Sequence, residues 1–100
     1  MKILIAADME GIIGVVHWDQ VNPSHPEYLR FRRWITEDVN AAIRGAFSGG
    51  TTSVLVTDGH RISRNILIEE LIRGDTQQRH SHASLHGAWC WPACGWRFLQ

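Results

Sequence analysis

The sequence predicts an α/β protein: a βαβ unit of a mostly parallel sheet with flanking helices, here in truncated form. Two short apolar runs, 3–7 and 53–57, are continuous rather than alternating, which is typical of strands buried on both faces. Between them, residues 28–46 carry apolar side chains at steps of three and four, as one face of an amphipathic helix does. A right-handed crossover in this strand–helix–strand order makes the two strands parallel.

The long helix has predicted start and stop signals. Ser24 is the expected N-cap, with Pro26 in the first turn and Glu27 as its capping-box partner. Gly49-Gly50 is the expected end, because glycine adopts the left-handed conformation at little cost. The residues predicted to face the core are Tyr28, Phe31, Ile35, Val39, Ala42 and Ala46.

A second, shorter helix is predicted after the second strand. Residues 62–72 contain Ile66, Leu67 and Leu71 at helical spacing, and Arg73-Gly74 would end the helix. Trp34 is expected to lie in or beside the core. The arginines at 30, 32 and 33 are expected to form a solvated helix face.

Composition restricts the function classes. A chain of 100 residues, 44% hydrophobic and 20% charged with zero formal net charge, is typical of one small globular domain. It has neither the basic balance of a nucleic-acid-binding protein nor an apolar segment long enough for a membrane span. With no signal-peptide pattern at the start, we expect a cytoplasmic protein without nucleic-acid or membrane partners.

Polar side chains follow both predicted strands at the point where each ends. Asp8 and Glu10 follow the first strand, and Asp58 and His60 follow the second. Parallel neighbouring strands bring such ends to one sheet edge, where α/β proteins usually bind ligands. Crowded carboxylates beside an imidazole favour a divalent cation such as zinc or manganese. A metal site formed by Asp8, Glu10 and His60 is therefore predicted.

Other interpretations of these residues remain open. Asp8 could cap a turn, Glu10 could be solvated, and His60 could form only local hydrogen bonds. His17 and Trp18, in the loop after the carboxylates, could contact substrate or another subunit, but local packing is the preferred interpretation. Gly11 and Gly14 do not complete any phosphate-binding loop pattern.

Four segments together resemble the amino-terminal part of the D-aminopeptidase family of zinc metallopeptidases. They are ADMEGIIG, YLRFRRWITEDVNAAIRGAF, VLVTDGH and NILIEEL, in the order and at the spacing of the family. The resemblance covers about residues 1–77 and implies an enzyme that removes N-terminal D-amino acids from short peptides. It also implies two adjacent zinc ions in the intact family site and a homo-oligomer, since some members assemble into large rings of identical subunits.

The resemblance implies a role for each matching residue. Asp8 matches a bridging metal ligand, and Glu10 and His60 match ligands of one metal. Asp58 is expected to support the site by orienting His60 or a loop amide, and Asn65 is expected to cap the short helix. The later metal ligands and the catalytic histidine of the family find no match, so no catalytic residue is assigned. At most one zinc ion is expected here.

The last quarter of the chain departs from the family pattern. Residues 76–100 contain no acidic residue but hold both cysteines and three of the five tryptophans. We expect a domain boundary near residue 77, with 78–100 a frameshifted or disordered tail. Suitable codons for 78–87, read in another frame, spell the family-like Ser-Gly-Thr-Pro-Thr-Pro. A rival interpretation is a metal cluster of His80, His82, His86, Cys90 and Cys94, although the spacing matches no known zinc module.

Three function hypotheses follow. The first is a metal-dependent D-aminopeptidase, represented by an incomplete fragment. The second is a catalytically inactive truncated chain, or a remnant that mediates interactions, with at most weak metal binding. The third, from the carboxylates alone, is a metal-dependent phosphohydrolase. Whether this chain is itself an enzyme is left open at this stage.

Overall fold

The computed structural model describes residues 1–72, 76–80 and 97–98. Strand β1 (Lys2–Ala7) leads through two short 3₁₀ turns, η1 (Met9–Gly11) and η2 (Trp18–Val21), to helix α1 (Tyr28–Ser48). Strand β2 (Ser53–Asp58), the 3₁₀ turn η3 (Ile68–Glu70), strand β3 (Thr76–His80) and strand β4 (Arg97–Phe98) follow. No helix in the described part of the chain is long and apolar enough to cross a membrane.

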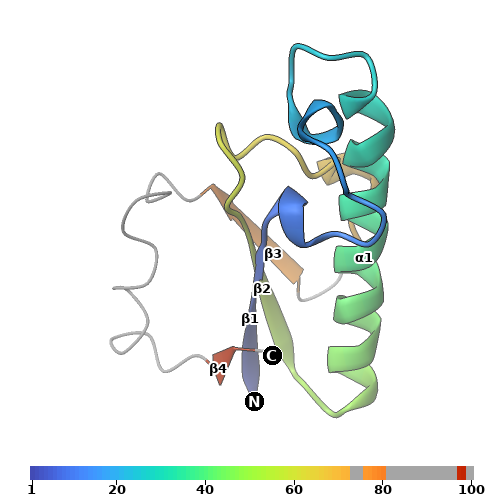
Figure 1. Ribbon diagram of the computed structural model, residues 1–100. Helices are drawn as coiled ribbons and strands as arrows, with labels where there is room; N and C mark the ends of the chain where they lie inside the picture. Colours follow the sequence, from blue (N-terminus) through green and yellow to red (C-terminus); the bar gives the residue numbers. More distant parts are fainter. Residues whose placement is uncertain (73–75, 81–96, 99–100) are drawn as a thin grey trace.

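The strands form a parallel sheet in the order β3-β2-β1-β4, and Figure 1 shows α1 lying along one face of it. The predicted βαβ unit and its α/β class are thereby confirmed. The β1–β2 register pairs Lys2 with Ser53 and Ala7 with Asp58, so both strands end at the same level. The residues that follow the two strands therefore share one edge of the sheet.

The core lies between α1 and the sheet. Five of the six side chains predicted to face it from α1 are buried, Ala42 is half-buried, and Ile43 is buried in addition. On β1, Ile3, Ile5 and Ala7 are buried but Ala6 is exposed. The continuous apolarity of β1 predicts burial on both faces. Among the described residues, only the face formed by Ile3, Ile5 and Ala7 is fully buried. The buried hydrophobic cluster consists of Ile3, Ile5, Ala7, Met9, Val21, Tyr28, Phe31, Ile35, Val39, Ile43, Ala46, Val54, Val56, Ile66 and Leu71.

The predicted start of α1 at Ser24 is wrong. The helix begins at Tyr28, and Glu27, its N-cap, makes no side-chain capping bond. His25 precedes Pro26, and the proline ring disfavours helical conformation for the residue before it. A turn forms instead, in which His25 Nδ1 accepts the Glu27 amide at 3.3 Å. The predicted end is confirmed: the helix stops at Ser48, and Gly50 has φ of +92°.

The predicted helix within 62–72 is also wrong, because only the 3₁₀ turn η3 forms there. Side chains of α1 bind the backbone of this segment in place of helical hydrogen bonds. Thr36 Oγ1 accepts the Leu67 amide at 2.9 Å, and Asn40 Oδ1 accepts the Ile72 amide at 2.9 Å. Buried backbone groups need partners of some kind, and tertiary contacts meet that need here.

Arg32 differs from the other two arginines of the predicted solvated face. Its Nε donates to the carbonyl oxygen of Asn65 at 3.0 Å, and its Nη2 donates to that of Arg64 at 2.9 Å. Arg30 and Arg33 are exposed, as predicted. Trp34, expected in or beside the core, is 39% exposed.

Gly14 is expected to be intolerant of any side chain. Its φ is +85°, and a Cβ placed there would lie 2.9 Å from the Trp34 ring. The Gly14→Ala variant should therefore lose about 1–3 kcal/mol in free energy of unfolding, measured by urea denaturation. Gly45→Ala is the matched control: a Cβ there meets nothing within 4 Å, and alanine favours the helix. Equal stability of Gly14→Ala and wild type would contradict this account of the loop.

Candidate metal centre

The turn after β1 turns two carboxylates to the same side. Met9, which lies between them, is completely buried and anchors η1 to the core. The Gly11 amide donates to the Asp8 carbonyl at 3.1 Å and closes the turn. With Met9 directed inward, the side chains of Asp8 and Glu10 are left exposed at the end of the strand.

The turn after β2 brings His60 beside these carboxylates. The Gly59 amide donates to the Ala7 carbonyl at 2.8 Å and extends the pairing of the two strands by one residue. A Cβ on Gly59 would lie 3.2 Å from that same carbonyl oxygen. Glycine therefore permits the close approach that places His60 opposite Asp8.

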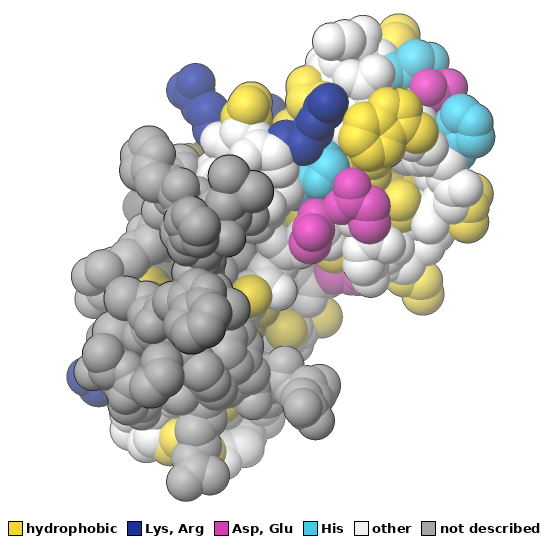
Figure 2. Space-filling view, turned by 60° about the vertical axis from the view of Figure 1, so that its left-hand side comes forward, with side chains coloured by type: hydrophobic (Ala, Val, Ile, Leu, Met, Phe, Trp, Pro, Cys, Tyr) yellow, Lys and Arg dark blue, Asp and Glu magenta, His cyan; other side chains and the backbone are white. Residues whose placement is uncertain are grey.

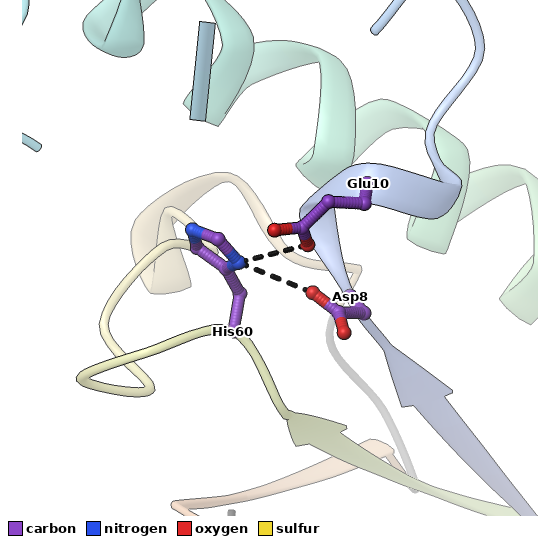
Figure 3. A group of neighbouring side chains, drawn as sticks. All are labelled: Asp8, Glu10 and His60. Carbon is purple, nitrogen blue, oxygen red and sulfur yellow. Dashed lines mark hydrogen bonds and ion pairs between the residues drawn. The ribbon is translucent and has the colours of Figure 1, made fainter. Parts of the chain in front are cut away.

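The three predicted ligand residues meet in the structure (Figure 3). His60 Nδ1 lies 3.2 Å from Asp8 Oδ1 and 3.0 Å from Glu10 Oε2. Ligand atoms of all three lie within 4.8 Å of one another. The His60 side chain is only 3% exposed, whereas those of Asp8 and Glu10 are 62% and 49% exposed. Figure 2 shows the acidic side chains at the surface next to a histidine, with basic and hydrophobic side chains nearby.

A backbone carbonyl fixes the tautomer of His60. Its Nε2 lies 2.8 Å from the carbonyl oxygen of Val21, at the end of η2. A carbonyl oxygen can only accept, so Nε2 carries the proton and donates it. In the neutral ring, Nδ1 then presents a lone pair to Asp8 and Glu10. A lone pair that faces two carboxylates is favourable only with a proton or a cation between them.

The electrostatics of Asp8 support this. The Glu10 carboxyl beside Asp8 is the largest cause of the lowered pKa of Asp8, while partial burial opposes this. Where the His60 ring also carries a proton on Nδ1, its hydrogen bond and its charge lower that pKa further. The lowered pKa keeps Asp8 ionised, which is the form that binds a metal ion.

The donor set fits zinc or a similar ion. One imidazole nitrogen and two carboxylates are ligands that zinc and manganese accept, and the carbonyl behind His60 is the usual partner of a metal-binding histidine. Asp8 makes no side-chain capping bond to η1, which removes the interpretation of it as a turn cap. Of the tail cluster predicted as a rival site, residues 82, 86, 90 and 94 and the His80 side chain lie outside the described residues.

Asp58 binds backbone amides of the loop. It is completely buried, and its Oδ2 accepts the amides of Asn65 and Ile66 at 2.6 and 2.9 Å. Its Oδ1 accepts the His60 amide at 3.3 Å and Asn65 Nδ2 at 2.8 Å. The carboxylate thus ties the loop that carries His60 to the end of β2. Two roles were predicted for Asp58, orienting His60 or binding a loop amide, and these contacts correspond to the second.

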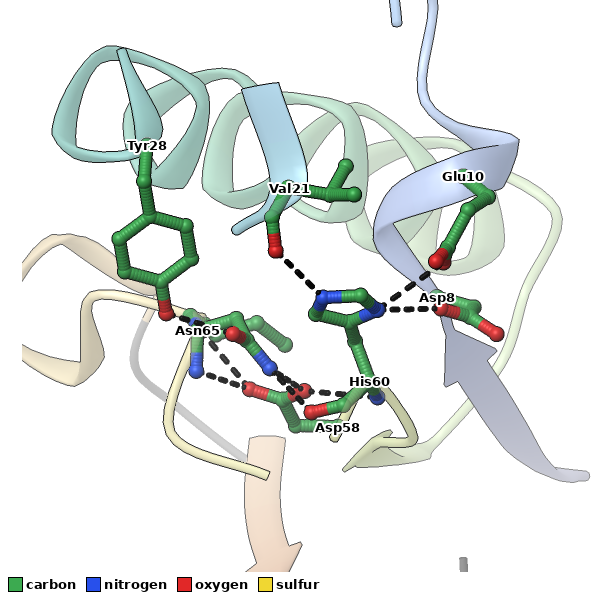
Figure 4. A network of polar contacts seen from close by, with 8 residues as sticks. Asp8, Glu10, Val21, Tyr28, Asp58, His60 and Asn65 are labelled. Atoms are coloured by element: carbon green, nitrogen blue, oxygen red, sulfur yellow. Dashed lines mark hydrogen bonds and ion pairs between the residues drawn. The ribbon is translucent and has the colours of Figure 1, made fainter. Parts of the chain in front are cut away.

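Asn65 and Tyr28 take part in the same network, which sequence reasoning missed (Figure 4). Asn65 caps no helix; its side chain joins Tyr28, Asp58 and His60. Tyr28 was assigned only to the helix core, and the Val21 carbonyl has no signal in a sequence. The asparagine that follows the Asp58-Gly59-His60 segment in the sequence was the one available clue.

His17 makes the local contact that was the preferred interpretation, whereas Trp18 contacts a residue distant in the sequence. His17 Nδ1 accepts the Asp19 amide at 3.2 Å and so caps η2. The Arg61 guanidinium stacks over the Trp18 ring, 5.0 Å from its centroid. This pair joins η2 to the loop that carries His60.

Comparisons with known proteins show which family and which fold the chain resembles. The family model described as D-aminopeptidase matches residues 1–82. A D-aminopeptidase of Bacillus subtilis (strain 168) is 39% identical over 71 residues, which are 71% of this chain and 26% of that protein. The solved structure of the zinc-dependent D-aminopeptidase DppA from Bacillus subtilis, described as a self-compartmentalizing protease, superimposes with a TM-score of 0.75 at 35% identity. That match covers 79% of this chain and 28% of that one. The chain thus spans about a quarter of the length of either relative.

Proposed function

The chain belongs to the D-aminopeptidase family, and we propose that it carries the amino-terminal part of a zinc-dependent aminopeptidase site. The observation that supports this most is the convergence of Asp8 and Glu10 on Nδ1 of His60. Asp8 is proposed as the bridging ligand, and Glu10 and His60 as ligands of one ion. A similar solved structure is described as zinc-dependent, which supports zinc as the metal.

The proposed substrate is a short peptide with an N-terminal D-amino acid. Bound zinc supplies Lewis acidity, which polarises a carbonyl group and acidifies a water molecule. The residues of this chain contribute charge and orientation. The carboxylates of Asp8 and Glu10 supply the negative charge that would hold the ion, and Asp58 holds the His60 loop.

For the 100-residue chain itself we propose binding of one zinc ion. Asp8, Glu10 and His60 are the one group of three metal-binding side chains found among the described residues. Two zinc ions and turnover are proposed for a protein that also carries the later part of the family sequence. A chain that binds zinc weakly without turnover is the alternative, and the assays below distinguish the two.

Hydrolysis assays test the proposed activity. The 100-residue chain and the longest product of the same coding DNA are each assayed with a D-alanyl peptide, its L-alanyl counterpart and a generic phosphate ester. The proposal expects D-alanyl hydrolysis by the longer product, lost with a chelator and restored by zinc. Cleavage of the phosphate ester alone would instead favour the phosphohydrolase hypothesis.

The proposed boundary near residue 77 is tested by sequencing the coding DNA from codon 70 to beyond the stop. A second frame that continues with Ser-Gly-x-Pro and later supplies a histidine and a glutamate is the expected result. The proposed boundary near residue 77 falls within strand β3 (Thr76–His80), and the family model matches as far as residue 82. A DNA sequence without such a frame would make the tail genuine and count against the frameshift.

Self-association is the proposed partnership, since a similar structure is described as self-compartmentalizing. Several exposed apolar side chains lie on the loops that follow η1 and β2, among them Ile13, Val16 and Ile62 at 72%, 87% and 62% exposure. Apolar surface of this kind marks interaction sites. Analytical ultracentrifugation measures the association, and a monomer at all concentrations would contradict it for this chain.

A further inference from the structure

His60 is fixed at its ring, its amide and its carbonyl group. The ring Nε2 donates to the Val21 carbonyl at 2.8 Å, and the amide donates to Asp58 Oδ1 at 3.3 Å. The carbonyl oxygen accepts Asn65 Nδ2 at 2.6 Å. The direction of Nδ1 therefore depends on contacts made behind His60, on the side away from Asp8 and Glu10 (Figure 4).

Asn65 is the central member of these contacts. It is completely buried, and its Oδ1 accepts the Tyr28 hydroxyl at 2.6 Å. Its Nδ2 donates to both Asp58 Oδ1 and the His60 carbonyl. The hydroxyl and the two acceptors fit only one orientation of the amide, because the opposite orientation places its oxygen against two acceptors. Tyr28 belongs to α1, so its hydroxyl joins Asn65 to the helix.

The backbone between His60 and Asn65 needs this restraint. Arg61 and Ser63 have φ of 46° and 56°, in the left-handed region that residues other than glycine rarely adopt. Such conformations persist only where surrounding contacts hold them, and they gather at functional sites. Here the Ser63 amide and Asn65 Nδ2 both donate to the His60 carbonyl. Loss of the Asn65 side chain removes one of the two donors to the His60 carbonyl, so this part of the loop is held less firmly and His60 with it.

We propose that Asn65, held by the Tyr28 hydroxyl, is a positioning residue that directs Nδ1 of His60 toward the metal ion. Asn65 itself does not bind the ion; it acts through His60 and the Asp58 loop contacts. This inference rests on the proposed function, because it presumes an ion between Asp8, Glu10 and His60. In this proposal the buried network presents Nδ1 of His60 to the ion and keeps Nε2 hydrogen-bonded to the Val21 carbonyl.

Metal affinity of matched variants tests the proposal. Co²⁺ is titrated into the 100-residue chain and into Asn65→Ala, Tyr28→Phe and Asn40→Ala, followed by its visible absorption. We expect about 10- to 100-fold weaker binding by Asn65→Ala. Tyr28→Phe, which loses one hydrogen bond, should bind about fivefold more weakly. Asn40→Ala is the control: it also removes a buried asparagine that binds the backbone, at Glu70 and Ile72, but away from His60.

A spectroscopic readout separates positioning from general destabilisation. In protein labelled with ¹⁵N-histidine and loaded with Cd²⁺, the His60 signals should show the metal on Nδ1 and the proton on Nε2. The His60 signals should shift or split into more than one set in Asn65→Ala and stay unchanged in Asn40→Ala. If Asn65→Ala does not fold, the Co²⁺ affinity and the His60 signals of Tyr28→Phe test the proposal by themselves.

Two negative results have different meanings. Wild-type affinity and wild-type His60 signals in both Tyr28→Phe and Asn65→Ala would overturn the positioning role while leaving the metal site intact. A wild-type chain that binds neither Co²⁺ nor Cd²⁺ would reject the proposed function, and the positioning role with it.

Discussion

The Asp8→Ala variant is expected to bind zinc about 100-fold more weakly than the wild-type chain. Structural zinc sites with four ligands bind with about 10–16 kcal/mol, so one ligand contributes roughly 3 kcal/mol, or about two powers of ten in affinity. The Asp8 side chain is 62% exposed, so its removal should leave the fold intact. Isothermal titration with zinc measures the effect directly.

Asp19→Ala is the matched control for this variant. Asp19 is an acidic residue of the following loop, and it lies 3.3 Å from His17 and 3.7 Å from His25. Its removal should leave zinc affinity within about twofold, because Asp19 lies outside the candidate metal centre. If Asp8→Ala kept wild-type affinity while Asp19→Ala lost it, the ion would belong to the His17–Asp19–His25 group.

The Asp58→Ala variant is expected to have the largest effect on stability. Asp58 is completely buried and accepts four N–H groups, three of them backbone amides. Its removal leaves these donors without their acceptor, and bonds to a charged group are worth about 1.5–3 kcal/mol each, without full additivity. We expect a loss of roughly 3–5 kcal/mol in the free energy of unfolding. The free energy of unfolding of a small domain is only about 5–15 kcal/mol in total, so this loss is a large part of it.

Urea denaturation followed by tryptophan fluorescence measures this loss. Asp58→Asn is the conservative comparison, since its amide oxygen still accepts, and it should fall between wild type and alanine. Asp8→Ala should unfold at nearly the wild-type urea concentration, which separates the residue that holds the loop from the residue that binds the ion. A loss below about 1 kcal/mol in Asp58→Ala would contradict the role given to the buried network.

The parts of the fold that were predictable are those with a local pattern. The two apolar runs became β1 and β2, and the three–four spacing became α1, because period and burial agree in these segments. The start of α1 was misplaced because Pro26 restricts His25 more strongly than Ser24 favours a cap. The segment 62–72 was misread because α1 side chains, which are distant in sequence, bind its backbone.

The candidate site was predictable to a similar extent. Strand order alone brings Asp8 and Glu10 to the same sheet edge as His60, and the structure places them in contact. The support behind His60 was not predictable. The Val21 carbonyl is a backbone group that any residue could offer, and the Tyr28 hydroxyl reaches Asn65 across 37 residues of sequence. Such contacts depend on the packed fold and leave no periodic signal.

X-ray diffraction from a crystal of the zinc-loaded chain, measured at the zinc absorption edge, tests the proposed metal centre most directly. We expect one anomalous peak, within bonding distance of Asp8, Glu10 and Nδ1 of His60, with Nε2 still hydrogen-bonded to the Val21 carbonyl. A zinc peak at His17, Asp19 and His25 instead, or no peak beside His60 in fully loaded protein, would contradict it.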